Sequence, residues 1–199
     1  MGAVFLAEQI AVGNRPVALK VLSRKLLDDP DFLQRFQNEA ASTGRIHHPN
    51  VVTIYESGQA DDGTPYIAME FLEGESLRQA LTRRGQLPVP EVAEILQQAA
   101  RGLNAAHKLG IIHRDLKPDN IFLTRGDEGE TIVKIVDFGI AKLREPAMRT
   151  LTGTVLGTPA YMSFEQASGM RNDKRVTTVS AVPTVGSSPD HEGRACWNS

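Results

Sequence analysis

The chain has 199 residues, a formal net charge of −2 and an isoelectric point near 6.2. This balance gives no electrostatic case for a nucleic-acid partner, and a hydrophobic content of 41% is ordinary for a globular protein. The single cysteine, Cys196, excludes an intrachain disulfide. No apolar run is long enough to form a membrane segment and the N-terminus shows no secretory signal, so we expect a cytoplasmic protein.

The first part of the chain alternates strand patterns with one helix pattern. Phe32, Phe36 and Ala40 recur at helical spacing and predict a helix over 31–46. Turn residues at 13–14 and 61–63 are typical of hairpins. Short apolar runs bounded by turn residues predict strands over 4–7, 16–22, 51–55 and 66–71.

The chain then becomes mainly helical. Ser76 is a suitable N-cap for a helix over 76–83, and Gly110 is a suitable stop for a longer helix over 90–109. The longer segment carries apolar residues on one face, which predicts that this face is buried. Two short strands are predicted on either side of a polar turn, at 121–123 and 133–136.

Two motifs in the second half carry most of the chemical information. The sequence His-Arg-Asp-Leu-Lys-Pro-Asp-Asn occupies 113–120, and Asp-Phe-Gly occupies 137–139. Their order and separation resemble the catalytic loop and the magnesium-binding loop of protein kinases. Val-Ala-Leu-Lys ending at Lys20 and Gly-Thr-Pro around Thr158 extend the resemblance, over residues 1–173, to the bacterial serine/threonine kinases of eukaryotic type.

The resemblance implies an α+β fold with two lobes. A small antiparallel sheet with one helix would form the N-terminal lobe, over about 1–72, above an incomplete and mainly helical lobe over about 73–173. ATP and Mg²⁺ would bind between the lobes. Residues 174–199 match no segment of the family, are rich in Ser, Thr, Pro and Gly, and are expected to be disordered.

The resemblance assigns a role to each polar residue of the motifs. Asp115 would accept the proton of the substrate hydroxyl or orient that hydroxyl, and Lys117 would stabilise charge on the transferring phosphoryl group. Asn120 and Asp137 would bind magnesium, and Lys20 would hold the nucleotide phosphates. Any one of these residues alone would be read as ordinary surface charge, so their combination carries the prediction.

Three further residues are expected to support this set. Glu39 lies on the predicted helix, where a glutamate of the family pairs with the lysine equivalent to Lys20; the alternative is a solvated acid on a helix face. His113 and Phe138 are expected to pack beneath the loops as structural residues.

The nucleotide pocket is expected to combine apolar side chains with backbone groups. By resemblance, Val4 and Ala18 would sandwich the adenine ring and Met69 would lie behind it. Glu70 and Leu72 would offer backbone hydrogen bonds to the adenine edge. The alternative is that these apolar residues belong to an ordinary core.

Regulation is predicted from the segment after the magnesium loop. Kinases with an arginine at the position of Arg114 commonly need a phosphorylated segment to neutralise it, and we expect phosphorylation at Thr150 and Thr152. Thr158 would shape the pocket for the acceptor residue. An ordinary polar loop is the alternative.

The match to the family is expected to be truncated at both ends. Gly2 is the only glycine of the phosphate-covering loop, and the last helices of the large lobe have no counterpart. The expected function is ATP-dependent phosphoryl transfer to serine or threonine hydroxyls of protein substrates, and the resemblance also allows a kinase homodimer. Two alternatives stay open: a catalytically inactive fragment that binds nucleotide or a protein partner, and a chain without a stable fold.

Overall fold

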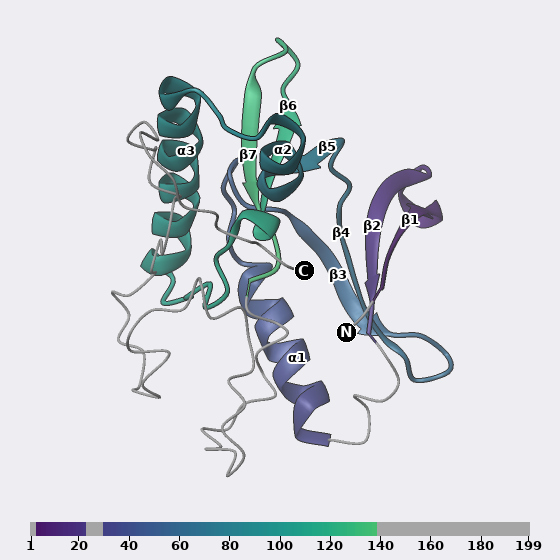
Figure 1. The fold of residues 1–199 in the computed structure, drawn as a ribbon. Coiled ribbons are helices and arrows are strands. Elements are labelled where there is room, and N and C mark those ends of the chain that lie inside the picture. The colour runs from purple at the N-terminus through teal and green to yellow at the C-terminus, as the bar shows by residue number, and fades with distance from the viewer. Residues whose placement is uncertain (1–2, 23–29, 139–199) are drawn as a thin grey trace, which may run out of the picture.

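A computed structural model describes residues 3–22 and 30–138 of the chain (Figure 1). The predictions for Gly2, Thr150, Thr152, Thr158 and the tail at 174–199 fall outside these residues. The elements in chain order are β1 Ala3–Gln9, η1 Ile10–Val12, β2 Arg15–Val21, α1 Pro30–Thr43, β3 Ile54–Gln59, β4 Pro65–Glu70, β5 Gly74–Ser76, α2 Leu77–Arg84, α3 Val89–Lys108, η3 Pro118–Asn120, β6 Ile121–Arg125 and β7 Thr131–Ile135.

The first sheet contains four antiparallel strands in the order β1-β2-β4-β3. The β1–β2 hairpin turns through Gly13 and Asn14, whose φ angles are 68° and 56°. In the β3–β4 turn, Asp62 Oδ1 accepts a hydrogen bond from the Thr64 N–H at 2.9 Å, and Gly63 has a φ of 79°. Both hairpin turns predicted from the sequence are therefore confirmed.

Helix α1 packs against this sheet through the face predicted from its apolar spacing. Phe36 and Ala40 are fully buried there. Sheet and helix thus share one core, because each has a single apolar face to remove from water. Its buried members are Leu22, Phe36, Ala40, Val52, Ile67 and Met69.

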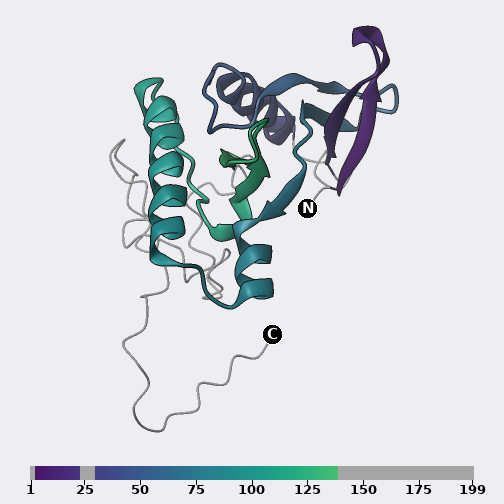
Figure 2. The same cartoon turned by 90° about the horizontal axis from the view of Figure 1, so that it is seen from above.

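The second sheet has three antiparallel strands in the order β5-β6-β7 and is covered by α2 and α3. Ser76 caps α2 through a capping box: its hydroxyl accepts the Gln79 N–H, and the Gln79 side chain accepts the Ser76 N–H. Figure 1 shows α3 running beside β7, and Figure 2 shows the β1–β2 hairpin on the opposite side of the molecule. The predicted α+β class with two parts is confirmed.

Three local features differ from the prediction. The helix expected over 31–46 ends at Thr43. The strand expected over 51–55 begins only at Ile54. Val51 and Val52 are instead buried and pair with Ile135 of β7, because this apolar pair joins the cores of the two sheets. Strand β5 was not predicted, since three residues starting at a glycine carry no strand periodicity.

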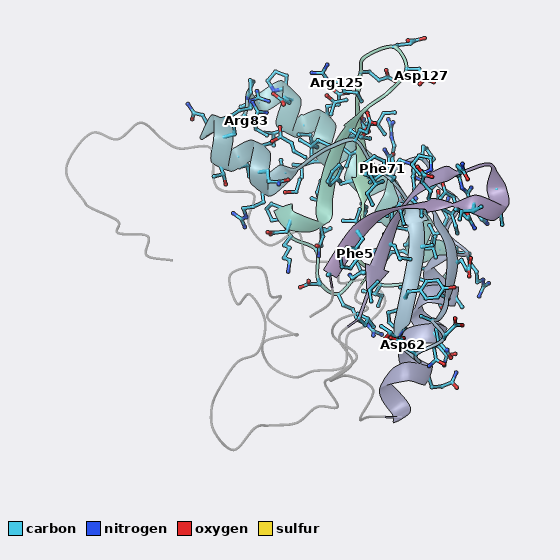
Figure 3. The ribbon with its side chains drawn as sticks, turned by 90° about the vertical axis from the view of Figure 1, so that its right-hand side faces the viewer. Phe5, Asp62, Phe71, Arg83, Arg125 and Asp127 are labelled. Atoms are coloured by element: carbon cyan, nitrogen blue, oxygen red, sulfur yellow. The ribbon has the colours of Figure 1, made fainter. Side chains whose placement is uncertain are left out.

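Charged loops lie far from the junction of the sheets. Figure 3 shows Asp62 in the β3–β4 turn and Asp127 in the β6–β7 turn at opposite ends of the molecule, with Phe5 and Phe71 between them. Both sheets lie between these two turns.

Candidate active site

Lys20 and Asp137 come from different sheets and meet in a direct ion pair. Lys20 lies on β2, and Asp137 follows β7 after one intervening residue. The Lys20 Nζ is 2.6 Å from Asp137 Oδ1, although 117 residues separate them in the chain. The structure thus places the predicted phosphate-binding ammonium beside the predicted magnesium-binding carboxylate.

The predicted partner of Lys20 was a different residue. Glu39 lies on α1, but its side chain is outside the described part of the structure, so the Lys20–Glu39 pair stays a prediction. The contact between Lys20 and Asp137 was not predicted. Sequence spacing gives no signal for it, because Lys20 was assigned to the nucleotide phosphates and Asp137 to magnesium, and 117 positions separate them.

A second polar cluster forms around Asp115 in the loop after α3. The Lys117 Nζ lies 3.1 Å from Asp115 Oδ2. Asn120 is buried, and its Nδ2 donates to the Asp115 carbonyl oxygen at 2.7 Å and to Oδ2 at 3.3 Å. With its Nδ2 engaged in this way, Asn120 has its side-chain oxygen left to offer to a hard cation such as Mg²⁺.

His113 connects the loop that carries Asp115 to the loop that carries Asp137. It is fully buried, and its Nε2 donates to the Val136 carbonyl at 2.9 Å while its Nδ1 accepts the Asp115 N–H at 3.3 Å. Burial lowers the pKa of His113 below its usual value, so the neutral ring with one donor and one acceptor matches both partners. The ring also packs on Phe138 at 4.7 Å between centroids, and the predicted structural role of both residues is confirmed.

Backbone strain is concentrated in the same loops. Arg114 and Asp137 have φ angles of 62° and 56°, in the left-handed region that residues with a Cβ seldom adopt. Hydrogen bonds hold both neighbourhoods: the Asp115 N–H donates to the His113 carbonyl at 2.8 Å and the Val136 N–H to the Asn120 carbonyl at 3.0 Å. Strain of this kind persists where surrounding structure enforces it, as in active sites.

The predicted adenine contacts need one correction. Val4 is paired with Lys20, and Leu6 with Ala18, so Val4 and Ala18 share one face of the first sheet. Two residues on one face of a sheet cover one side of a ring and cannot sandwich it. Met69 is the cross-strand partner of Ala18, is buried, and lies on this face as well.

Phe122 on β6 is the candidate for the other side of the ring. It pairs with Lys134, and the Lys134 side chain contacts Glu70 at the end of β4, so this face of the second sheet is turned toward β4. Phe122 was not among the residues predicted for the pocket; it lies two residues after the 113–120 motif, in the strand predicted over 121–123.

Glu70 has a larger role than the backbone contact predicted for it. Its N–H donates to the Thr53 carbonyl at 2.8 Å, so only its carbonyl could bind the amino group of adenine. Its carboxylate is 2.8 Å from the Lys134 Nζ and accepts the Thr53 N–H at 3.2 Å. This ion pair ties the first sheet to β7. Leu72 packs against the first core. The backbone hydrogen bond from Leu72 to the adenine edge stays a prediction.

Comparison with known proteins agrees with this geometry. The family model described as the protein kinase domain matches residues 1–181. This chain belongs to the protein kinase family. The resemblance drawn from its motifs is therefore confirmed.

Individual relatives of this kinase domain are bacterial. It is 44% identical over 180 residues to the serine/threonine-protein kinase pkn3 of Myxococcus xanthus, covering 88% of this chain and 32% of that protein. It is 40% identical over 173 residues to the serine/threonine-protein kinase PknA of Mycobacterium tuberculosis, covering 85% of this chain and 39% of that protein. The kinase domain thus spans about a third of the length of these curated relatives.

Solved structures show the same fold. The crystal structure of the Mycobacterium tuberculosis PknI kinase domain matches with a TM-score of 0.69 and 33% sequence identity, over 88% of this chain and 63% of that one. The two sheets and the helices of this kinase domain are therefore part of the two-lobe kinase fold.

The residues of this kinase domain fit the metal and nucleotide that the family uses. Mg²⁺ prefers oxygen ligands and is typically held by one or two protein groups together with substrate phosphates. Asp137 and Asn120 offer such oxygens, and Lys20 offers a cation for phosphate. Within residues 3–22 and 30–138, no cluster of three His, Cys, Asp or Glu residues could hold a metal without such help, and no helix is long and apolar enough to cross a membrane.

Proposed function

We propose that this kinase domain transfers the terminal phosphoryl group of ATP to serine or threonine hydroxyls of protein substrates. The observation that carries the proposal is the convergence of the Lys20–Asp137 pair and the Asp115–Lys117–Asn120 cluster, joined through His113. Phosphoryl transfer depends on positioning and on charge neutralisation, and these groups provide both.

Each side chain has a defined task in this reaction. Asp115 accepts the proton of the acceptor hydroxyl. The hydroxyl oxygen forms a bond to the γ-phosphorus, while the bond between the γ-phosphorus and the bridging oxygen of ADP breaks. Lys117, 3.1 Å from Asp115, places positive charge beside the incoming phosphoryl oxygens. Bound Mg²⁺ would neutralise the phosphates, with Asp137 and Asn120 as its protein ligands and Lys20 as a phosphate contact.

The acceptor class is supported by two observations. Lys117 stands two residues after Asp115, the arrangement by which the sequence resembles serine/threonine kinases. The relatives are themselves named serine/threonine-protein kinases. These names also weigh against the alternative of an inactive fragment that binds only nucleotide or a partner.

The finer expectations are part of the same proposal. Phosphorylation at Thr150 and Thr152 would neutralise Arg114, and Thr158 would shape the acceptor pocket. We place the reaction in the cytoplasm, where ATP is supplied, and a homodimer would allow one copy to phosphorylate the segment of the other.

The decisive experiment measures phosphotransfer and nucleotide binding on the same variants. Transfer from radiolabelled ATP to a generic basic protein is expected for the parent chain and for Asp127→Asn, a matched control in the β6–β7 turn. Asp115→Asn should lose transfer by about 10³-fold or more while still binding Mg-ATP. Retained transfer in Asp115→Asn would refute the proposal, and binding without transfer in the parent would favour the inactive alternative.

A further inference from the structure

One edge of β7 is covered by two amide side chains that the proposed chemistry does not use. Strand β7 pairs with β6 on its inner edge. On the outer edge, Gln98 Oε1 accepts the Val133 N–H at 2.9 Å, and Gln98 Nε2 donates to the Thr131 carbonyl at 2.9 Å. Gln98 lies on α3, so the helix side chain replaces a neighbouring strand along this edge.

Asn50 continues the same edge toward the active site. Its Nδ2 donates to the Val133 carbonyl at 2.9 Å and to Gln98 Oε1 at 3.0 Å. Its backbone carbonyl accepts the Ile135 N–H at 2.9 Å, and the Val52 N–H donates to the Ile135 carbonyl at 3.0 Å. The backbone groups of Thr131, Val133 and Ile135 are thus hydrogen-bonded to the two amide side chains or to the backbone of residues 50–52. Ile135 is two residues before Asp137.

The amide pair is itself held in place. Asn50 is buried, and its N–H donates to His48 Nδ1 at 3.1 Å. A Cβ added at Gly102 of α3 would lie 2.7 Å from the Asn50 carbonyl oxygen, so the helix approaches Asn50 as closely as a glycine permits. The two amide side chains are therefore held in fixed positions between α3 and β7.

The position of β7 along its own axis decides the position of Asp137. A slip by one residue would move Asp137 by about 3.3 Å and reverse the face on which its side chain lies. Functional side chains must be held to within about 0.5 Å. In the order β5-β6-β7, β7 lies at one end of the described sheet, so hydrogen bonds on its outer edge contribute directly to this register.

We propose that Gln98, acting with Asn50, is a positioning residue for the magnesium-binding carboxylate of Asp137. The proposal rests on the proposed function, because it assumes that Asp137 binds the metal. Gln98 touches neither substrate nor metal; it acts by fixing the strand from which Asp137 follows. Loss of a hydrogen bond made directly to a metal ligand typically weakens metal affinity about 10- to 100-fold. Gln98 acts through the backbone of Thr131 and Val133, so we expect an effect at the lower end of that range.

The test is a Mg²⁺ titration of the full chain at a fixed concentration of fluorescent ADP. The variants are Gln98→Met, which removes both hydrogen-bonding groups, and Gln98→Glu, which keeps an acceptor for Val133 but places a carboxylate oxygen against the Thr131 carbonyl and the Glu94 carboxylate. Gln97→Met and Gln97→Glu are matched controls on the exposed face of the same helix. Asp137→Asn is the reference for loss of the metal ligand.

Gln98→Met should raise the Mg²⁺ concentration at half-saturation about tenfold over Gln97→Met, and Gln98→Glu should raise it over Gln97→Glu. A purely structural role would reduce the amplitude by unfolding part of the sample and would leave the midpoint unchanged. An unchanged midpoint in a Gln98→Met variant that melts cooperatively overturns the proposal. If Gln98→Met does not fold, an unchanged midpoint of Gln98→Glu relative to Gln97→Glu overturns it.

The two proposals fail in different ways. If Asp137→Asn abolishes Mg²⁺-dependent binding and the Gln98 variants match their controls, only the positioning role is wrong. If the parent shows no saturable Mg²⁺ dependence, or Asp137→Asn binds like the parent, the metal role of Asp137 is wrong and the positioning role fails with it.

Discussion

Strand β1 and the loops that carry the motif residues are held by different means. Within residues 3–22 and 30–138, strand β1 lies at the edge of its sheet and pairs with β2 alone, and Val4, Phe5 and Leu6 are each more than half exposed. In the motif loops, His113 and Asn120 are buried and hydrogen-bonded to neighbouring segments. The position of strand β1 is thus set by backbone pairing and should tolerate side-chain changes, whereas the motif loops depend on individual side chains.

The largest expected difference is between two phenylalanines. Phe138 is buried at the junction of the loops, and Phe138→Ala should lower the free energy of unfolding by about 3–5 kcal/mol because it leaves a cavity. Phe5→Ala on β1 should change it by no more than about 0.5 kcal/mol. Urea unfolding of both variants measures this, and equal losses would contradict the comparison.

The ion pair between the two sheets should rank next. Lys134→Met removes the ion-pair partner of the Glu70 carboxylate, which keeps the Thr53 N–H, and should cost about 2 kcal/mol of unfolding free energy. Arg125→Met, on the exposed end of the neighbouring strand, is the control and should be close to neutral. If both variants unfold at the same urea concentration, Lys134 does not join the sheets energetically.

A smaller effect is expected in the β1–β2 turn, whose conformation does depend on one residue. Gly13 has a φ of 68° in open space, so Gly13→Ala should cost about 1 kcal/mol through backbone strain alone. Gly13→Asn should cost less, because asparagine tolerates the left-handed region. Thermal melts distinguish the two, and an Asn variant less stable than the Ala variant would be evidence against strain as the cause.

The smallest effect at neutral pH concerns His113. Its pKa is lowered in the folded state by burial, so below the unfolded value of about 6.5 the unfolded chain takes up a proton that the folded chain excludes. The contribution of His113 to stability is therefore complete above that pH and is lost as the pH falls through the folded pKa. His113→Phe should flatten the slope of unfolding free energy between pH 7 and pH 5, and an unchanged slope would assign it to other groups.

Much of this arrangement follows from the sequence because its signals are local. The apolar period of the longer helix places Ile95, Ala99 and Leu103 in the core, and all three are buried. Ser76 caps α2 as its residue type indicates. The motif residues Asp115, Lys117 and Asn120 lie within six positions of one another, so a single loop brings them together.

The features that sequence analysis missed are contacts between distant residues. Gln98 follows the exposed Gln97 on a helix and its polar side chain looks like a solvated one, yet it completes the edge of a strand. Lys134 and Glu70 each resemble ordinary charges in alternating strands, and only the packing of the two sheets joins them. Periodicity reports which face of an element is buried, but not which polar group on another element meets it.

The distance in sequence between Lys20 and Asp137 has a consequence for folding. The contact spans 117 residues, and closing a long loop costs chain entropy before the contact is gained. The hairpins and helices on either side contain only short-range contacts and can form earlier. After dilution from denaturant, secondary structure should therefore return before the capacity to bind nucleotide, and the active site should be among the last parts of the molecule to assemble.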